Sequence, residues 1–233
     1  MIAAPPAALT AAPARIELAG AARQVVRVTN PGRTRVVVDA SQAGFALGLR
    51  GRPRIVRSDP AARLSIRPHR FALRPGETGA VSVASSSVAH GGGAAGDHPA
   101  LVLLTATVPG ANAIGVRLRV GIRVVVRVRG AVVHRLALGA VAVRRRALDL
   151  VIRNRGNVVE RIGAGNLRVR LRRGGVVVAS LDVPERELLP GARGIVTLRR
   201  PRVRGRLSAL VELWPADAPA KAARLVVRLR DGT

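Results

Sequence analysis

Residues 116–129, VRLRVGIRVVVRVR, alternate between apolar and mostly basic side chains. Successive side chains of a β-strand point to opposite faces, so this alternation predicts one long strand with an apolar face and an arginine face. No long amphipathic helix is evident, and short strands separated by turn residues are typical of antiparallel β-sandwiches. The pattern therefore predicts an all-β chain. Further strand candidates are QVVRVT (24–29), LVLLTATV (101–108), LRVRLR (167–172) and RLVVRLR (224–230).

One phrase of eleven residues occurs twice. Residues 73–83 read LRPGETGAVSV, and residues 188–198 read LLPGARGIVTL. Proline presets the backbone of a turn and glycine allows positive φ, so each copy predicts a Pro-Gly turn that leads into a strand. An asparagine-containing turn precedes each copy, at Asn30-Pro31-Gly32 and at Asn154-Arg155-Gly156. The repeat predicts two β-sandwiches of roughly a hundred residues each, joined by a short connection.

The first residues, MIAAPPAALTAAPA, lack the basic flank and continuous apolar stretch of a secretory signal. They are similar to the Ala/Pro-rich segment that often follows such a signal, and a misplaced start codon would explain its absence. No stretch approaches the ~20 apolar residues that span a bilayer, so an integral membrane protein is not expected. We expect residues 1–13 to be disordered, and sandwiches to occupy 14–129 and 132–230.

The net charge of +27 and a pI near 12 are typical of proteins that bind polyanions. All of the 40 basic residues except Lys221 are arginine, however, and GC-rich codons encode arginine as well as the abundant Ala, Gly and Pro. Only Phe45, Phe71 and Trp214 are aromatic, whereas single-strand nucleic-acid binders use aromatic platforms. The absence of cysteine excludes disulfides, zinc–cysteine sites and thiol catalysis.

No motif organises a catalytic site. Ser82, His69 and Asp97 could be combined into a triad, but the sequence has no nucleophile-elbow motif. His90, Asp97 and His98 fall in SSSVAHGGGAAGDHP (85–99), which predicts a glycine-rich loop that cannot preorganise a site. We therefore expect neither an enzyme nor a bound metal or cofactor. His134 and Trp214 are expected to be structural, with Trp214 covering one end of the second core.

These landmarks together resemble the periplasmic chaperones of pilus assembly, which consist of two immunoglobulin-like domains. The resemblance covers residues 14–128 in order and extends more weakly over 132–230. It implies two tandem immunoglobulin-like antiparallel β-sandwiches and a periplasmic, secreted or cell-envelope location. It rests on RVTNPGRTRVVVDASQ (27–42), LSIRPHRFALRPGETGAVSV (64–83), GDHPALVLLTATVP (96–109), VIRNRGN (151–157) and the second Pro-Gly phrase.

The family resemblance also implies a binding site. Such a chaperone lends its long closing strand to an incomplete pilin subunit, a form of β-augmentation, and two basic residues between the domains anchor the subunit's terminal carboxylate. Arg15, in ARIEL, falls at the first anchor position. The ungapped match places Gly121 at the second, flanked by Arg119 and Arg123, and a shift of two residues moves a side chain roughly 7 Å. The residues implied to contact the subunit are Ile114, Val116, Leu118 and Val120.

The leading hypothesis is a non-catalytic, chaperone-like envelope protein. It binds another polypeptide, pilin-like or of another kind, by edge-strand pairing or in the cleft between domains. An alternative is a structural or adhesive envelope module that holds an anionic polymer through surface arginines, with binding that salt weakens. Nucleic-acid binding is a third hypothesis and predicts a steep salt dependence. The arginine face of 116–129 also fits a solvated face that protects an edge strand from aggregation.

Overall fold

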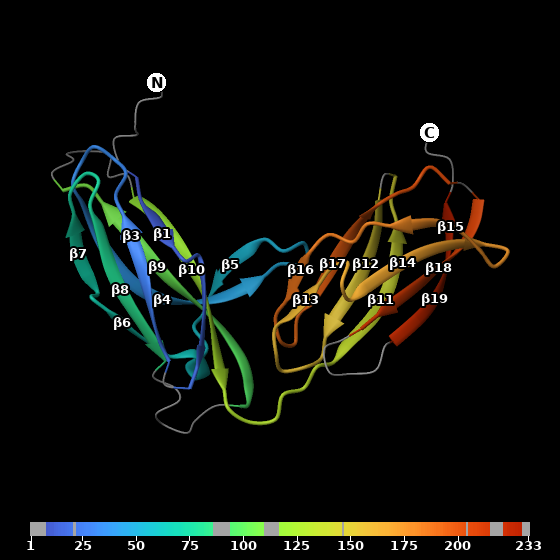
Figure 1. Cartoon of the computed structure of the whole chain (residues 1–233), viewed down its shortest axis with the longest axis horizontal. Helices are drawn as coiled ribbons and strands as arrows, with labels where there is room; N and C mark the ends of the chain where they lie inside the picture. The colour runs from blue at the N-terminus through green and yellow to red at the C-terminus, as the bar shows by residue number, and fades with distance from the viewer. Residues whose placement is uncertain are drawn as a thin grey trace. The chain divides into compact units, whose positions relative to one another are not determined.

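The computed structural model describes residues 8–20, 22–85, 94–109, 117–145, 147–203, 205–214 and 221–229, the last range by its backbone alone. The all-β prediction is confirmed: the described residues form strands and one short 3₁₀-helix, Pro60–Ala62. They fall into two compact units (Figure 1). The first contains Met1–Ala46 and Ile55–Ala131, and the second contains Leu47–Arg54 and Val132–Thr233. The chain therefore contributes to the second unit twice, through an early segment as well as the C-terminal half.

Two sheets enclose the core of the first unit. One has the strand order β1-β3-β8-β6, and the other has the order β2-β10-β9-β4-β5, with β7 also paired to β4. Their inner faces bury a cluster made mainly of valine and leucine, which suits a pleated, two-layered core. The strands are β1 (Thr10–Ala12), β2 (Arg15–Ala19), β3 (Arg23–Thr29), β4 (Val36–Leu47), β5 (Pro53–Val56), β6 (Leu64–Arg67), β7 (Arg70–Leu73), β8 (Thr78–Ser85), β9 (Gly96–Thr107) and β10 (Arg117–Val128).

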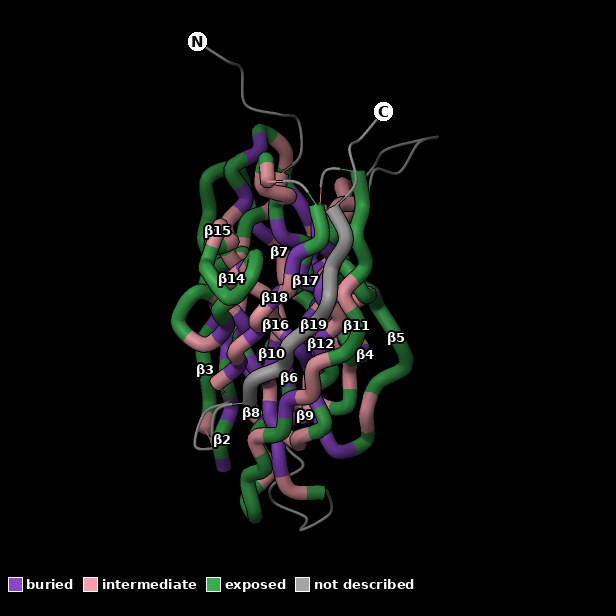
Figure 2. The backbone as a smooth tube through the Cα atoms, turned by 90° about the vertical axis from the view of Figure 1, so that its right-hand side faces the viewer, coloured by how far each residue is buried: buried purple, intermediate pink, exposed green. Residues whose placement is uncertain are grey.

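The second unit repeats the two-layered plan with its own core. Its sheets have the orders β11-β12-β17 and β15-β14-β18-β19, and β13 pairs with β16. Figure 2 shows buried residues interleaved with exposed ones along the strands, as period-two alternation requires. The prediction of two tandem immunoglobulin-like sandwiches is confirmed. The strands are β11 (Leu136–Val143), β12 (Ala147–Asn154), β13 (Glu160–Ile162), β14 (Leu167–Arg173), β15 (Val176–Leu181), β16 (Arg186–Leu188), β17 (Arg193–Arg199), β18 (Gly205–Leu213) and β19 (Lys221–Leu229).

The N-terminal segment enters the fold earlier than the sequence indicated. Residues 10–12, which were expected to be disordered, form β1 and pair with β3 in one sheet. After a cis Ala12–Pro13 peptide, β2 pairs in parallel with β10 in the other sheet. The partly buried Ala11 packs against the core. Alanine and proline are depleted in strands, so the composition of this segment gave no strand signal.

The repeated phrase forms the same turn in both units. The amide of Glu77 donates to Arg74 O and that of Ala192 donates to Leu189 O, both at 3.1 Å. Gly76 and Gly191, at the third turn position, have φ of +74° and +70°. Proline at the second position and positive φ at the third define a type II turn, so the turn chemistry predicted for both copies is confirmed.

The last glycine of each phrase is a packing position. A Cβ on Gly79 would lie 3.1 Å from Leu73 Cδ2, and one on Gly194 would lie 2.5 Å from Leu188 Cδ2. In each copy the phrase's own first leucine, which is buried, therefore fills the space above its last glycine. The first leucine and the last glycine of the eleven-residue pattern are thus explained by one contact.

In each unit a buried asparagine connects the Pro-Gly turn to an earlier part of the chain. Asn30 Nδ2 donates to the carbonyls of Thr34 (2.8 Å), Leu73 (3.2 Å) and Arg74 (3.2 Å), and its Oδ1 accepts from Gly32 N. Asn154 plays the same part in the second unit. Its Nδ2 donates to the carbonyls of Val158 (2.7 Å) and Leu188 (3.1 Å), and its Oδ1 accepts from Gly156 N. Through these bonds each buried asparagine side chain has its own polar atoms satisfied and is tied to the backbone on both sides of the turn.

Candidate polypeptide-binding edge strand and arginine pair

Strand β10 is covered along one edge and only half covered along the other. It pairs with β9 over its whole length, from Arg117 to Val128. On its other side β2 pairs with Arg123–Arg127 only. Within the described part of the chain, no strand pairs with this second edge between Arg117 and Ile122. That portion of β10 is a free sheet edge, the type of surface to which another strand can add.

The two faces of β10 differ as the alternation predicts. Ile122, Val124 and Val126 are fully buried in the core of the first unit. Leu118 and Val120 share that face but are only partly buried, and both pack against the same core. Two of the sequence-predicted contact residues, Ile114 and Val116, lie outside the described residues.

Arg15 and Arg123 lie opposite each other where the free edge ends. They are register partners in the parallel β2–β10 pairing, and Arg123 N donates to Ala14 O at 3.0 Å. The Arg15 side chain is 19% exposed, and its Nη2 is 2.9 Å from Glu17 Oε1. Arg119, the other flanking residue, is exposed and lies opposite Thr105 of β9. The structure therefore places Arg123 beside Arg15 and leaves Arg119 further along the strand.

Gly121 occupies a crowded position. A Cβ there would lie 3.3 Å from Leu101 Cδ1, and Leu101 is only 7% exposed. A side chain at Gly121 would require this buried leucine to shift by a few tenths of an ångström, because the contact is shorter than ordinary van der Waals distance. Glycine at this position is therefore explained by packing, and Arg123 is the basic residue that shares a register position with Arg15.

An ion pair between the half-exposed Arg127 and the buried Asp97 lies at one end of the β9–β10 ladder. Strand β9 begins at Gly96, so Asp97 and His98 are strand residues and not part of the predicted loop. Arg127 Nε and Nη2 donate to the two oxygens of Asp97 at 2.6 and 2.8 Å, a bidentate pair with a buried carboxylate. The hydrogen bonds that Arg127 donates to Asp97 raise the pKa of Arg127 above its ordinary value. Asp97 therefore has a structural partner in Arg127.

His98 also has a structural partner. Its Nδ1 is 2.9 Å from Asp59 Oδ2, and its Nε2 is 2.7 Å from Ala94 O. Burial alone would raise the pKa of Asp59, but hydrogen bonds from His98 and from Ala61 N outweigh this effect and lower it. His90, the third residue of that sequence cluster, lies outside the described residues. Among the residues that are described, no group of three or more His, Asp or Glu side chains could hold a metal ion.

The second unit contains a polar cluster that the sequence did not reveal. Asp149, only 3% exposed, accepts from Arg144 Nε (2.7 Å), Arg50 Nη2 (2.9 Å) and Thr197 Oγ1 (2.8 Å). Burial alone would raise the pKa of Asp149, but these hydrogen bonds outweigh burial and hold the pKa below its ordinary value. Arg50 reaches Asp149 from the early segment Leu47–Arg54, 99 residues away in sequence. No local pattern signals so distant a partner.

The remaining sequence candidates have structural surroundings. His134 Nδ1 is 2.9 Å from the buried Glu160 Oε1. The guanidinium of Arg168 lies 5.1 Å from the ring centroid of Trp214, a cation–π contact at the end of β18. In the described residues, no helix has the length and apolar character required to cross a bilayer.

The fold is that of two-domain immunoglobulin-like pilus chaperones. Similar structures include the class 5 fimbriae chaperone CfaA (TM-score 0.57, 12% identity, covering 94% of this chain and 100% of that chain). A chaperone–tip adhesin complex of CFA/I fimbriae gives a TM-score of 0.58 at 12% identity, covering 94% and 98%. The complex of Salmonella enterica SafA pilin with the SafB chaperone gives 0.51 at 14% identity, covering 95% and 96%. No family model and no curated protein matches the sequence. The resemblance to periplasmic pilus chaperones is thus confirmed for the fold.

Proposed function

We propose that this protein is a non-catalytic, chaperone-like protein of the periplasm or cell envelope that binds a pilin-like polypeptide. The partner adds a strand to the free edge of β10, between Arg117 and Ile122. The observation that carries the proposal is that this edge ends where Arg15 and Arg123 are register partners. The fold shared with pilus chaperones supports the same function.

The free edge would supply main-chain hydrogen bonds, and its side chains would supply apolar contacts. An added strand pairs with unpartnered N–H and C=O groups, while alternate side chains determine which partner fits. Leu118 and Val120 retain some exposure, so a partner can cover surface that the chain's own core leaves accessible. Ile114 and Val116, which continue the same alternation in the sequence, would extend the contact.

The arginine pair would hold the partner's terminal carboxylate. Guanidinium groups bind carboxylates through charge-assisted hydrogen bonds, which are stronger than neutral ones. Arg15 already holds the exposed Glu17 carboxylate at 2.9 Å, so an incoming carboxylate can replace a group of the same chemistry. The pair would therefore set the register of the added strand.

A capture experiment tests the edge strand. The full chain is immobilised, an envelope extract from its host is applied, and bound polypeptides are identified by mass spectrometry. Leu118→Glu should reduce capture at least tenfold, because it places a charge on the contact face. Val25→Glu is the matched control, since Val25 is 53% exposed on β3, which belongs to the other sheet of the first unit, and its capture should equal wild type. Equal capture by all three proteins would refute strand addition.

A peptide experiment tests the arginine pair. A synthetic peptide copying the C-terminus of the captured polypeptide is prepared with a free carboxylate and with an amide. The free acid should bind at least tenfold more tightly to wild type, and Arg123→Ala should remove the difference. The anchor is contradicted if the variant keeps the preference for the free acid. Anionic-polymer and nucleic-acid binding stay predictions, and a salt-insensitive affinity for the peptide would count against both.

A further inference from the structure

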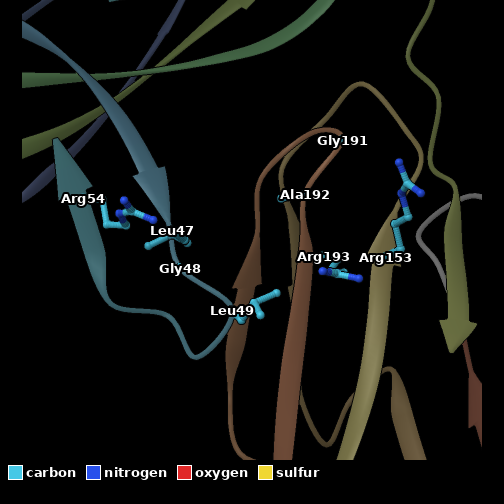
Figure 3. Close-up of a pocket in the computed structure, with 8 residues that line it drawn as sticks. All are labelled: Leu47, Gly48, Leu49, Arg54, Arg153, Gly191, Ala192 and Arg193. Carbon is cyan, nitrogen blue, oxygen red and sulfur yellow. The ribbon is translucent and has the colours of Figure 1, made fainter. Parts of the chain in front are cut away.

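A second candidate binding site lies within the second unit. A pocket of about 430 Å³ opens between the early segment Leu47–Arg54 and the ends of β12 and β17 (Figure 3). This volume falls within the range of small-molecule sites. Its lining consists of apolar, small and basic residues: Leu47, Gly48, Leu49, Arg54, Arg153, Gly191, Ala192 and Arg193.

The three arginines of the pocket make an unusual charge arrangement. Arg153 and Arg193 are direct cross-strand partners in the β12–β17 ladder, and Figure 3 shows their side chains on neighbouring strands, with Arg54 on the opposite wall. Like charges directly opposite each other in a sheet are destabilising. None of the three guanidinium groups contacts a carboxylate of the described residues, and the lining contains no acidic residue. The carboxylates of Asp149, Glu160 and Glu212 are paired with other residues.

The walls of the pocket are fixed by hydrogen bonds. Leu49 O accepts from Ile195 N at 2.8 Å and from Arg186 Nη2 at 2.6 Å. Arg50, the next residue, is held by Asp149. Gly191 belongs to the type II turn of the second Pro-Gly phrase. The backbone of both walls is therefore held in place before any ligand arrives, which lowers the entropic cost of binding.

We propose that this pocket binds a phosphate ester. Three cations without a carboxylate partner favour a doubly charged oxyanion over a monovalent one, and guanidinium forks match the geometry of phosphate oxygens. The pocket, at about 430 Å³, is larger than one phosphate ion fills, which leaves room for an organic group. Leu47 and Leu49 then supply an apolar wall for the organic part of the ester.

Binding measurements on the full chain test this site. The probes are inorganic phosphate, glycerol 3-phosphate and phosphatidylcholine vesicles containing phosphatidylglycerol, titrated at fixed ionic strength. We expect glycerol 3-phosphate to bind more tightly than inorganic phosphate, and Arg153→Gln or Arg193→Gln to weaken its binding at least tenfold. If the protein binds the vesicles and both variants lose vesicle affinity to the same extent, the phosphate ester that the pocket recognises is a lipid headgroup. Binding of the soluble ester alone would identify a free one.

Arg199→Gln is the matched control, because Arg199 is exposed on the same face of β17 but lies opposite Ala147. It removes one positive charge without touching the pocket, and its affinity should stay within twofold of wild type. Without ligand, Arg153→Gln and Arg193→Gln should melt at or above the wild-type temperature, since each relieves a like-charge pair. Binding of none of the probes, or equal weakening by Arg199→Gln and the pocket variants, would overturn the proposal.

Discussion

Each unit contains its own copy of the same Pro-Gly turn, but the two units differ in how their last strands are paired. Asn30 with Pro75-Gly76 and Asn154 with Pro190-Gly191 make the same turn and the same amide-to-carbonyl bridges. β10 of the first unit has β2 alongside half of one edge, whereas β19 of the second pairs only with β18 among the described strands. The repeated Pro-Gly turns and their asparagines therefore build the framework common to both units. The candidate binding edge depends on the partial pairing of β2 with β10, which the second unit does not repeat among its described strands.

The largest expected effect concerns the corner asparagines. Asn30→Ala removes four side-chain hydrogen bonds and Asn154→Ala removes three. At roughly 1 kcal/mol for each bond, Asn30→Ala should lose about 4 kcal/mol and Asn154→Ala about 3 kcal/mol of unfolding free energy, each in its own unit. Urea unfolding followed by circular dichroism reports both units, while Trp214, the only tryptophan, reports the second. If Asn30→Ala shifts the Trp214 transition as much as Asn154→Ala does, the corners do not act locally.

A smaller loss of unfolding free energy is expected from Asp149→Asn, and only in the second unit. Asp149→Asn weakens hydrogen bonds from Arg50, Arg144 and Thr197, but both arginines are more than half exposed and can be rehydrated. We expect a loss of about 2 kcal/mol, measured by the Trp214 transition. In the first unit, Asp39→Asn is a control of the same chemistry, since Asp39 is 48% exposed and 3.7 Å from Arg70. A comparable loss from Asp39→Asn would contradict the assignment.

Asp149 also makes the stability of the second unit pH-dependent. Its pKa is lower in the folded protein than the ordinary value of 3.8. Its contribution is therefore complete above that value and is lost as the pH falls through the lowered pKa. The Trp214 transition of wild type should weaken below about pH 4, and that of Asp149→Asn should weaken less. Identical acid profiles for the two proteins would show that Asp149 does not carry the effect.

The smallest loss of stability is expected from alanine at Gly76 or Gly191, and it should be equal in the two units. Gly76 and Gly191 have φ of +74° and +70°, and no atom lies within 4 Å of a Cβ built on either. Alanine at either position is therefore strained only through its backbone, at a cost of about 1 kcal/mol. Thermal unfolding of the two single variants should show equal losses within error. Unequal losses would mean that the two turns differ in a way that their dihedral angles do not record.

Much of the fold follows from local sequence. Alternation places Ile122, Val124 and Val126 in the core, and the Pro-Gly phrase specifies a type II turn twice. Such features depend on neighbouring residues along one strand or turn, so they can be predicted from sequence. The start of β9 was misplaced because Gly96 and the preceding residues carry the composition of a loop.

The candidate sites depend on contacts between distant residues. Arg15 was identified through the family resemblance, but its pairing with Arg123 required the register of β2 against β10. The bonds of Asp149 to Arg50 and of Leu49 O to Ile195 join segments about a hundred or more residues apart. Neither hydrophobic period nor turn chemistry encodes such pairings, so the pocket in the second unit could not be anticipated.

The segment Leu47–Arg54 has a consequence for how this protein can be divided. Because it supplies Arg50 to Asp149 and Leu49 O to Ile195, the second unit is discontinuous in the gene. A protein fragment that starts at Val132 would lack eight residues of its own unit. Recombination at the short connection between the units would therefore transfer an incomplete module. The two halves can therefore diverge freely in their loops, but they are inherited together.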